Sequence, residues 1–313
     1  MSRAYVFPGQ GAQAIGMGQE IASQSSAAKA VFEEVDEALG ENLSGLIWEG
    51  DIETLTLTAN AQPALMACSL AVVRALEEAG VAISDGSYVA GHSLGEYSAL
   101  AAAGALSVAD TARLLRLRGE AMQSAVPAGE GAMAALLGLG YEAVAEIAQE
   151  AAGKDVCAAA NDNDPSQVVL SGDKAAVERA VELAKEKGAK RALMLPVSAP
   201  FHCALMQPAA DAMAEALDGV EIKTPSVPVV QNVSANAIKD PEILRQQLVD
   251  QVTAVVRWRE SVSWMARQGV TEIWELGAGK ALSGMIKRID RSIATRAVGT
   301  SADIAAATEA TPA

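Results

Sequence analysis

One serine lies in a sequence motif that is typical of a catalytic nucleophile. Residues 91–95, Gly-His-Ser-Leu-Gly, match the pattern G-x-S-x-G, follow a short apolar run and precede a helical pattern. The two glycines allow a sharp turn, which would project the hydroxyl of Ser93 beside a helix N-terminus whose N–H groups can meet an oxyanion. The alternative is an ordinary glycine-rich turn, and the flanking elements favour the nucleophile.

A serine hydroxyl becomes a useful nucleophile only when a base takes its proton, and histidine is the usual base near neutral pH. The chain has two histidines, His92 and His202. His92 precedes Ser93 on the incoming strand, where neighbouring side chains point to opposite sides, so it is poorly placed as the base. His202 follows Pro200 in a loop and is the remaining candidate, with a surface or packing role as the alternative.

An arginine lies among apolar residues on a predicted helix over 108–122. At helical spacing, Arg118 shares a face with Leu114, Leu115 and Met122. A guanidinium in apolar surroundings needs an anion to offset its desolvation. An internal Asp or Glu would make a structural ion pair, whereas a substrate carboxylate would be held by the bidentate fork of the guanidinium. The residues alone do not decide between a structural ion pair and a substrate-binding role for Arg118.

Glycine-rich loops follow two predicted strands, at 9–11 and 277–279. The first matches a loose dinucleotide fingerprint, but the acidic residues about 20 positions later, Glu33 and Glu34, lie inside a helical pattern and not at a strand end. We therefore expect both loops to let the backbone approach an active site closely. The side-chain amide of Gln10 could then donate to an oxyanion.

The elements that must position these residues alternate between apolar runs and amphipathic helices, which predicts an α/β fold. The middle of the chain has the order βαββαβ, which is typical of the ferredoxin-like unit. We expect a small domain over 127–197, inserted into a large α/β domain formed by 1–126 and 198–313. The predicted strands of the insert cover 132–137, 156–160, 168–171 and 192–197, with Asp173 capping its second helix. The order of the tail over 301–313 is doubtful because it lacks a strong apolar period.

Composition excludes several classes of protein. Half of the 313 residues are hydrophobic, and 24 Lys plus Arg against 39 Asp plus Glu give a net charge of −15. A globular chain with this negative charge is not expected to bind nucleic acid or anionic lipid through a broad electrostatic surface. Three scattered cysteines (Cys68, Cys157 and Cys203) form neither a disulfide framework nor a CxxC zinc pair. The beginning of the chain lacks a signal-peptide pattern, and no apolar stretch reaches a membrane span, so we expect a cytoplasmic protein.

Several ordered motifs together resemble those of a known family over nearly the whole chain. They are Phe-Pro-Gly-Gln-Gly-Ala-Gln at 7–13, Gly-His-Ser-Leu-Gly-Glu at 91–96, Arg-Gly at 118–119, the segment 161–169 with Pro-Ser-Gln, Phe-His at 201–202, and Glu-Leu-Gly-Ala-Gly at 275–279. In this combination the chain resembles the malonyl-CoA:acyl carrier protein transacylases. The resemblance implies an α/β-hydrolase-like large domain with a ferredoxin-like small domain.

The resemblance also implies roles for matching residues. Ser93 would attack the thioester, His202 would act as the base, and Arg118 would bind the malonyl carboxylate. Gln10 and the backbone N–H of Leu94 would form the oxyanion hole.

Two further assignments come only from the resemblance. The third member that holds His202 would be a backbone carbonyl, at the position matching Gln251, and Phe201 would belong to the malonyl-selecting version of the site. The chain departs from the family at 254–255, where Ala-Val stands in place of a frequent Asn-Pro, and at Ala278, which replaces a frequent Pro. Neither change removes a reacting group.

The expected reaction is a ping-pong transfer of malonyl from malonyl-CoA, through a serine ester, to the phosphopantetheine thiol of acyl carrier protein in fatty acid biosynthesis. No cofactor or metal is expected, since malonyl-CoA and phosphopantetheine are substrates. Docking of an acidic carrier would need local basic residues, for which the candidates are Lys190, Arg191, Lys287, Arg288 and Arg291. The main alternative is a serine esterase or thioesterase that uses the same Ser93 and His202, and a non-catalytic acyl-CoA-binding module is the third.

Overall fold

The computed structural model describes residues 2–197 and 199–309, and its larger sheet has six strands in the order β10-β9-β1-β2-β7-β8. Their bounds are β1 Arg3–Phe7, β2 Tyr88–Gly91, β7 Val229–Val230, β8 Ala237–Ile238, β9 Glu272–Leu276 and β10 Ala294–Val298. Only the β7–β8 pairing is antiparallel. The carboxyl ends of β1, β2 and β7 therefore meet at one edge, where the loops that follow them can form a site.

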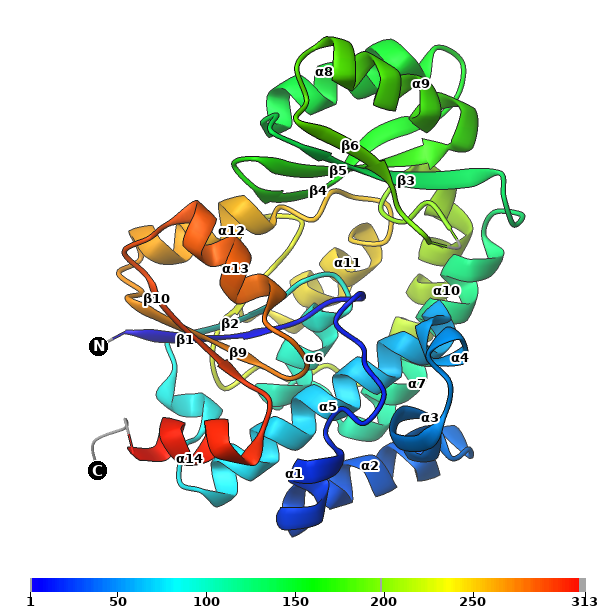
Figure 1. The fold of residues 1–313 in the computed structure, drawn as a ribbon. Helices are drawn as coiled ribbons and strands as arrows, with labels where there is room; N and C mark the ends of the chain where they lie inside the picture. Colours follow the sequence, from blue (N-terminus) through cyan, green and yellow to red (C-terminus); the bar gives the residue numbers. More distant parts are fainter. Residues whose placement is uncertain (1, 198, 310–313) are drawn as a thin grey trace.

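Both faces of this sheet are covered, as parallel strands require. Alternate residues of β1 enter different cores: Tyr5 and Phe7 pack with the helices of the first part of the chain, whereas Ala4 and Val6 pack with α12 and α13. Figure 1 shows these two helical layers on opposite sides of the strands. The helices are α1 Gln19–Gln24, α2 Ser26–Leu39, α3 Leu43–Glu49, α4 Ile52–Thr56, α5 Thr58–Glu78, α6 Gly95–Ala102, α7 Val108–Ser124, α10 Gln207–Asp218, α11 Pro241–Asp250, α12 Trp258–Arg267, α13 Ala281–Ile289 and α14 Ser301–Glu309.

The smaller sheet is antiparallel throughout, in the order β4-β5-β3-β6. It is formed by β3 Gly131–Leu137, β4 Cys157–Asp164, β5 Gln167–Asp173 and β6 Arg191–Met194, and carries α8 Tyr141–Ala152 and α9 Lys174–Glu186. These two helices cover one face (Figure 1). The opposite face contributes Met133, Ala135 and Val169 to the core of the larger sheet, so the two sheets share one apolar interior.

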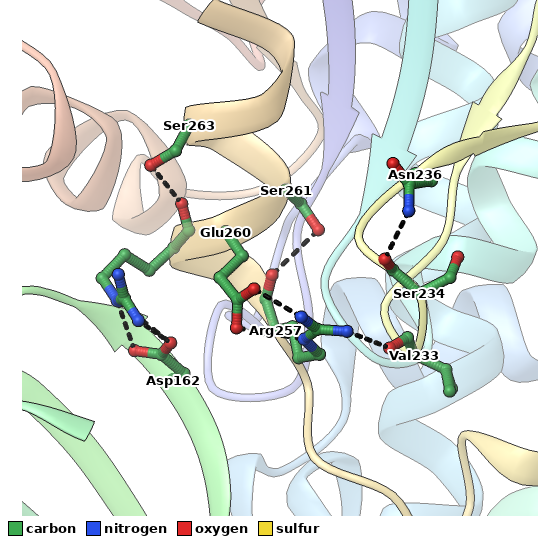
Figure 2. A network of polar contacts seen from close by, with 9 residues as sticks. Asp162, Val233, Ser234, Asn236, Arg257, Glu260, Ser261 and Ser263 are labelled. Carbon is green, nitrogen blue, oxygen red and sulfur yellow. Dashed lines mark hydrogen bonds and ion pairs between the residues drawn. The ribbon is translucent and has the colours of Figure 1, made fainter. Parts of the chain in front are cut away.

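Two buried carboxylates tie the smaller sheet to the helices of the larger one. Asp162 on β4 is contacted by both Nε and Nη2 of Arg259 on α12, and Asp164 pairs with Arg288 on α13 at 2.7 Å. Figure 2 shows Asp162 reaching from the small sheet toward α12. Beside these pairs, Asn161 forms a parallel bridge to Val256. These partners explain why β4 continues to Asp164 although the sequence predicted its end at 160.

Two other local predictions were wrong, and the structure decides part of the tail, which the sequence left undecided. β6 ends at Met194, not at 197. Asp173 precedes α9, but its carboxylate does not cap that helix, because its Oδ2 accepts the N–H of Val156 instead. The segment 301–309 is the helix α14, since Ile304 and Ala307 are buried against the main core; residues 310–313 lie outside the described part of the chain.

No helix within 2–197 and 199–309 is long and apolar enough to span a membrane.

Candidate active site

The serine of the G-x-S-x-G motif sits at a strained turn between β2 and α6. Ser93 has φ of 53°, in the left-handed region that side chains other than glycine rarely adopt. A Cβ on Gly91 would lie 1.9 Å from the backbone carbon of Gly95, and one on Gly95 would lie 2.3 Å from the carbonyl oxygen of Phe7. Only glycine fits at either position, and the crowding that requires it holds the serine at the sheet edge.

His202 is hydrogen-bonded to the serine. Its Nε2 lies 2.8 Å from Oγ of Ser93, and its Nδ1 lies 2.9 Å from the backbone carbonyl oxygen of Gln251. A carbonyl can only accept, so Nδ1 carries the proton and, in the neutral ring, Nε2 presents its lone pair to the serine hydroxyl. The carbonyl therefore fixes the tautomer that a general base needs.

Burial keeps this histidine neutral. Its side chain is only 4% exposed, and desolvation, together with the positive charge of Arg118, lowers the pKa of His202 to about 3. The hydrogen bond to the Gln251 carbonyl acts in the opposite direction but does not prevail. At neutral pH the imidazole is an unprotonated base.

Arg118 projects from α7 into the same cluster and is 1% exposed. Its Nη2 donates to Oγ of Ser93 at 3.2 Å and to Oε1 of Gln251 at 2.8 Å, and its Nη1 donates to Oε1 of Gln62 at 2.8 Å. No ion pair within 2–197 and 199–309 includes this arginine, and burial lowers its pKa. A buried cation held by neutral oxygens is prepared to receive an anion.

A cavity of about 350 Å³ opens onto the serine, the histidine and the arginine. It lies between the strand ends of the larger sheet and the inner face of the smaller one. Its walls come from both: Gln10, Gly11, Gln13, Thr56, Gln62, His92, Ser93, Leu94, Arg118, Met122, Met133, Asn161, Leu195, Pro196, Val197, Phe201 and His202. Every residue that the sequence analysis singled out for the site except Gln251 lines this cavity.

The two expected oxyanion donors line the same cavity as the serine. Gln10 follows β1, and its Nε2 donates to Oγ1 of Thr58 at 3.2 Å. Leu94 immediately precedes α6, so its backbone N–H belongs to the start of a helix. Gln251, which does not line the cavity, is fully buried and accepts a hydrogen bond from His202 through its backbone carbonyl. Phe201 precedes the histidine in the chain and is 8% exposed.

The comparison with known proteins agrees with this geometry. The acyl transferase domain family matches residues 4–276. The chain belongs to this family. Among relatives, it is 50% identical over 296 residues to a malonyl CoA-acyl carrier protein transacylase of Bacillus subtilis, covering 94% of this chain and 92% of that one. It is 45% identical over 306 residues to the protein of the same name from Escherichia coli K12, covering 98% of each chain.

Solved structures of similar acyltransferases superpose on nearly the whole chain. An acyl-carrier-protein-S-malonyltransferase from Bartonella henselae has a TM-score of 0.97 at 55% identity and covers 99% of each chain. A malonyl-transacylase solved in complex with a type II PKS acyl-carrier protein has a TM-score of 0.96 at 43% identity, covering 99% of this chain and all of that one. The α/β architecture of the family therefore extends over both sheets.

In this acyltransferase, sequence reasoning missed Asn232, which follows β7. Its Oδ1 accepts the N–H of Ser93 at 2.8 Å, and its Nδ2 donates to the carbonyl of Gly91 at 2.7 Å. The amide of Gln251 donates to the carbonyl of Ser93 and to Oδ1 of Asn232. Asn232 is thus hydrogen-bonded to the backbone of the serine turn at both Gly91 and Ser93. The sequence signal that could have indicated Asn232 was its position as a polar residue just after the predicted strand at 229–231.

Glu96 supports Asn232 from the interior of the acyltransferase. Its Oε2 accepts the backbone N–H of Asn232 at 2.7 Å, and the residue is fully buried. Desolvation raises the pKa of Glu96 to about 8, although the bond from Asn232 and the charge of Arg118 act to lower it. The carboxyl is therefore largely protonated at neutral pH.

The side chain of His92 contacts the smaller sheet and α12, which is a different role from that of a general base. Its Nε2 lies 2.8 Å from Oδ1 of Asn163 on β4, and its ring lies against Trp258 with centroids 5.8 Å apart. The expectation that His92 does not serve Ser93 agrees with this partner. The contact joins the serine turn to the smaller sheet across the cavity wall.

Proposed function

We propose that this acyltransferase moves a malonyl group from malonyl-CoA to the phosphopantetheine thiol of acyl carrier protein, by a ping-pong mechanism through an ester on Ser93, in fatty acid biosynthesis. One observation carries the proposal: Oγ of Ser93 lies within hydrogen-bond reach of both His202 and the buried cation Arg118. The first contact activates a nucleophile, and the second places a site for a carboxylate beside it. The names of the relatives point to the same substrates.

In the first half-reaction, Oγ of Ser93 attacks the thioester carbonyl while Nε2 of His202 takes the hydroxyl proton. The carbonyl of Gln251 holds Nδ1–H and stabilises the imidazolium that forms. The tetrahedral intermediate then collapses, the C–S bond breaks, and the proton passes from His202 to the departing CoA thiolate. The products are malonyl-Ser93 and CoA.

The negative charge of that intermediate needs preorganised donors. We assign them to the amide of Gln10 and the backbone N–H of Leu94, which come from the loops after β1 and β2. In the structure, the Gln10 amide donates to Thr58, so it must turn from that hydroxyl toward the oxyanion. The helix dipole of α6 favours negative charge at the same place.

Arg118 selects the acyl group by its charge. Its guanidinium, buried without a carboxylate partner in the described chain, would form a bidentate contact with the malonyl carboxylate. Phe201 fills the wall next to His202, which supports a small acyl group and disfavours larger branched ones.

The second half-reaction reverses the first. The carrier's phosphopantetheine thiol gives its proton to His202 and attacks the ester carbonyl; Ser93 leaves and is reprotonated by His202. Every step is a proton or acyl transfer, so no cofactor is proposed. Of the five basic residues expected to dock the carrier, Arg288 is already paired with Asp164, while Lys190, Arg191, Lys287 and Arg291 have no ion pair within the described ranges.

The acyl acceptor distinguishes this proposal from a serine thioesterase built on the same pair. We would incubate the enzyme with malonyl-CoA, with and without holo acyl carrier protein, and follow CoA release and the masses of both proteins. Stoichiometric loading without carrier, then rapid transfer to its thiol, is expected. Continuous release of free malonate at the same rate with and without carrier would identify a thioesterase. Tight binding of malonyl-CoA without a covalent adduct would identify a binding module.

The finer description of the fold is also a proposal. The parallel sheet with the serine turn after β2 supports an α/β-hydrolase-like large domain over 1–126 and 198–313. The strand order β4-β5-β3-β6 and the two helices on one face support a ferredoxin-like small domain over 127–197. Residue 198, at the predicted boundary, lies outside the described ranges. A cytoplasmic location is proposed from the three free cysteines, and thiol labelling of the protein in intact cells would test it.

A further inference from the structure

Left-handed backbone at residues other than glycine occurs at three positions within 2–197 and 199–309. Ser93 has φ of 53°, His202 has φ of 58°, and Ala235 has φ of 51°. Such backbone costs free energy unless its surroundings hold it, and it concentrates at functional sites. Ser93 and His202 are the nucleophile and the base of the proposed reaction. The third position marks the turn between β7 and β8, which carries Asn232.

The β7–β8 turn is a rigid support for this asparagine. Its main chain closes on itself, because the N–H of Ala235 donates to the carbonyl of Gln231 at 3.0 Å. Arg257 binds the turn from one side. Its N–H donates to the carbonyl of Asn232 at 3.1 Å, and its guanidinium donates to the carbonyl of Val233 at 3.1 Å (Figure 2). The turn therefore holds Asn232 in a fixed place at the carboxyl edge of the larger sheet.

The side chain of Asn232 fits the serine turn in one orientation only. Its Oδ1 accepts the N–H of Ser93, and its Nδ2 donates to the carbonyl of Gly91. A flipped amide would set a donor against a donor and an acceptor against an acceptor. Gln251 favours the same orientation, because its Nε2 donates to Oδ1 of Asn232 at 3.3 Å. Asn232 is fully buried, so its amide is matched to the backbone of the turn and not to solvent.

Two reacting groups depend on the backbone that this amide holds. The position of the Ser93 backbone decides whether Oγ points toward Nε2 of His202. The carbonyl of Ser93 shares a peptide plane with the N–H of Leu94, the expected oxyanion donor, and it accepts from the amide of Gln251 at 3.1 Å. A serine backbone that relaxed from the left-handed region would move Oγ and turn the N–H of Leu94 together.

We propose that Asn232 is a positioning residue for the nucleophile: its amide holds the left-handed backbone of Ser93, so that Oγ meets His202 and the N–H of Leu94 meets the oxyanion. This inference rests on the proposed function. Asn232 does not line the cavity, so it acts through Ser93 and not by contact with the substrate. Its loss should slow both half-reactions and leave the binding of CoA unchanged.

Asn232→Ala tests the inference through two reactions of Ser93. One is single-turnover acylation by malonyl-CoA, and the other is sulfonylation by phenylmethylsulfonyl fluoride, in which Oγ displaces fluoride while His202 takes the proton. Both should slow about a hundredfold, the cost of misplacing a reacting group by about 1 Å, with the Kd for CoA unchanged. Asn236→Ala is the matched control, because it truncates an exposed asparagine of the same turn, and it should change neither rate. Equal rates in Asn232→Ala and wild type would overturn the inference.

Asn232→Asp keeps the size of the side chain and tests its hydrogen bonds separately from the fold. A protonated carboxyl can accept from Ser93 and donate to Gly91, as the amide does, whereas an ionised one has no proton to donate. Burial raises the pKa of a carboxyl, so sulfonylation of this variant should become faster as the pH falls from about 7 to about 5.

The titratable groups around Asn232 change little over this range. His202 stays neutral because its pKa is about 3, and Glu96 stays largely protonated because its pKa is about 8. Arg118 keeps its positive charge. The wild-type rate should therefore be nearly level, and an equally level profile for Asn232→Asp would overturn the inference even if Asn232→Ala does not fold.

The sulfonyl fluoride also separates this inference from the proposed function. A wild-type enzyme that reacts with the reagent but takes no malonyl group from malonyl-CoA would reject the proposed function. In that case the sulfonylation rates of the Asn232 variants still decide whether the amide positions Ser93, with slower reaction expected and rates equal to wild type overturning it.

Discussion

Nη2 of Arg118 donates a hydrogen bond to Oγ of Ser93 at 3.2 Å, so the cation that would hold the substrate's carboxylate also touches the nucleophile. The same nitrogen donates to Gln251, whose carbonyl orients His202. Acyl recognition and nucleophile activation are therefore parts of one hydrogen-bonded cluster. A change in any member should affect substrate choice and the base together.

Arg118→Ala should reduce malonyl transfer far more than acetyl transfer, because only malonyl supplies a carboxylate. Loss of charge-assisted hydrogen bonds worth about 1.5–3 kcal/mol predicts a fall in kcat/KM of roughly 10- to 100-fold for malonyl-CoA. Steady-state rates with malonyl-CoA and acetyl-CoA would show it. Arg113→Ala, on the exposed side of the same helix, is the control and should change neither rate. An equal fall with both donors would make Arg118 structural.

Acylation should persist well below the usual range of histidine titration. The neutral form of His202 is the active one, and its folded pKa of about 3 lies below the ordinary 6.5, so activity is retained as the pH falls through 6.5. In Arg118→Leu the repelling charge is gone, and the acid limb should move to higher pH. Single-turnover acylation with acetyl-CoA, which needs no carboxylate site, would measure both profiles. An unmoved limb would show that Arg118 does not act on the base.

Gln10→Ala should slow both half-reactions, because the same oxyanion forms in each. Removal of one oxyanion donor predicts a loss of about 10²–10³ in kcat. The matched control is Gln24→Ala, which truncates an exposed glutamine of α1 outside the cavity. Acylation by malonyl-CoA and discharge to holo carrier would be timed separately. A loss confined to one half-reaction would argue against an oxyanion role.

Glu96→Gln should flatten the pH dependence of stability. A carboxyl whose folded pKa is raised to about 8 contributes stability that is fully present below its unfolded value of 4.5 and is lost as the pH rises through 8. Glutamine keeps an acceptor for the N–H of Asn232 but does not titrate. Urea unfolding from pH 5 to 9 would compare the variant with wild type and with exposed Glu120→Gln. Parallel curves for Glu96→Gln and wild type would contradict a buried protonated carboxyl.

The serine turn and the inward-facing Arg118 were predictable from the sequence because each depends on local spacing, and His202 was predictable because only one other histidine exists and it is poorly placed. The structure brings all three together, and it places the carbonyl of Gln251 on His202 despite the missing Asn-Pro at 254–255. Contacts between distant segments were not predictable in this way. Asn232 acts on a turn 139 residues earlier, and β4 extends through Asp162, which pairs with β5 and meets Arg259 from another helix.

The proposed mechanism requires an acyl ester at Ser93, and intact-protein mass measurement after mixing with malonyl-CoA tests this directly. Wild type should gain the mass of one malonyl group and lose it when holo carrier protein is added, while Ser93→Ala should gain nothing. A malonyl adduct of equal yield in Ser93→Ala would place the nucleophile elsewhere and contradict the mechanism.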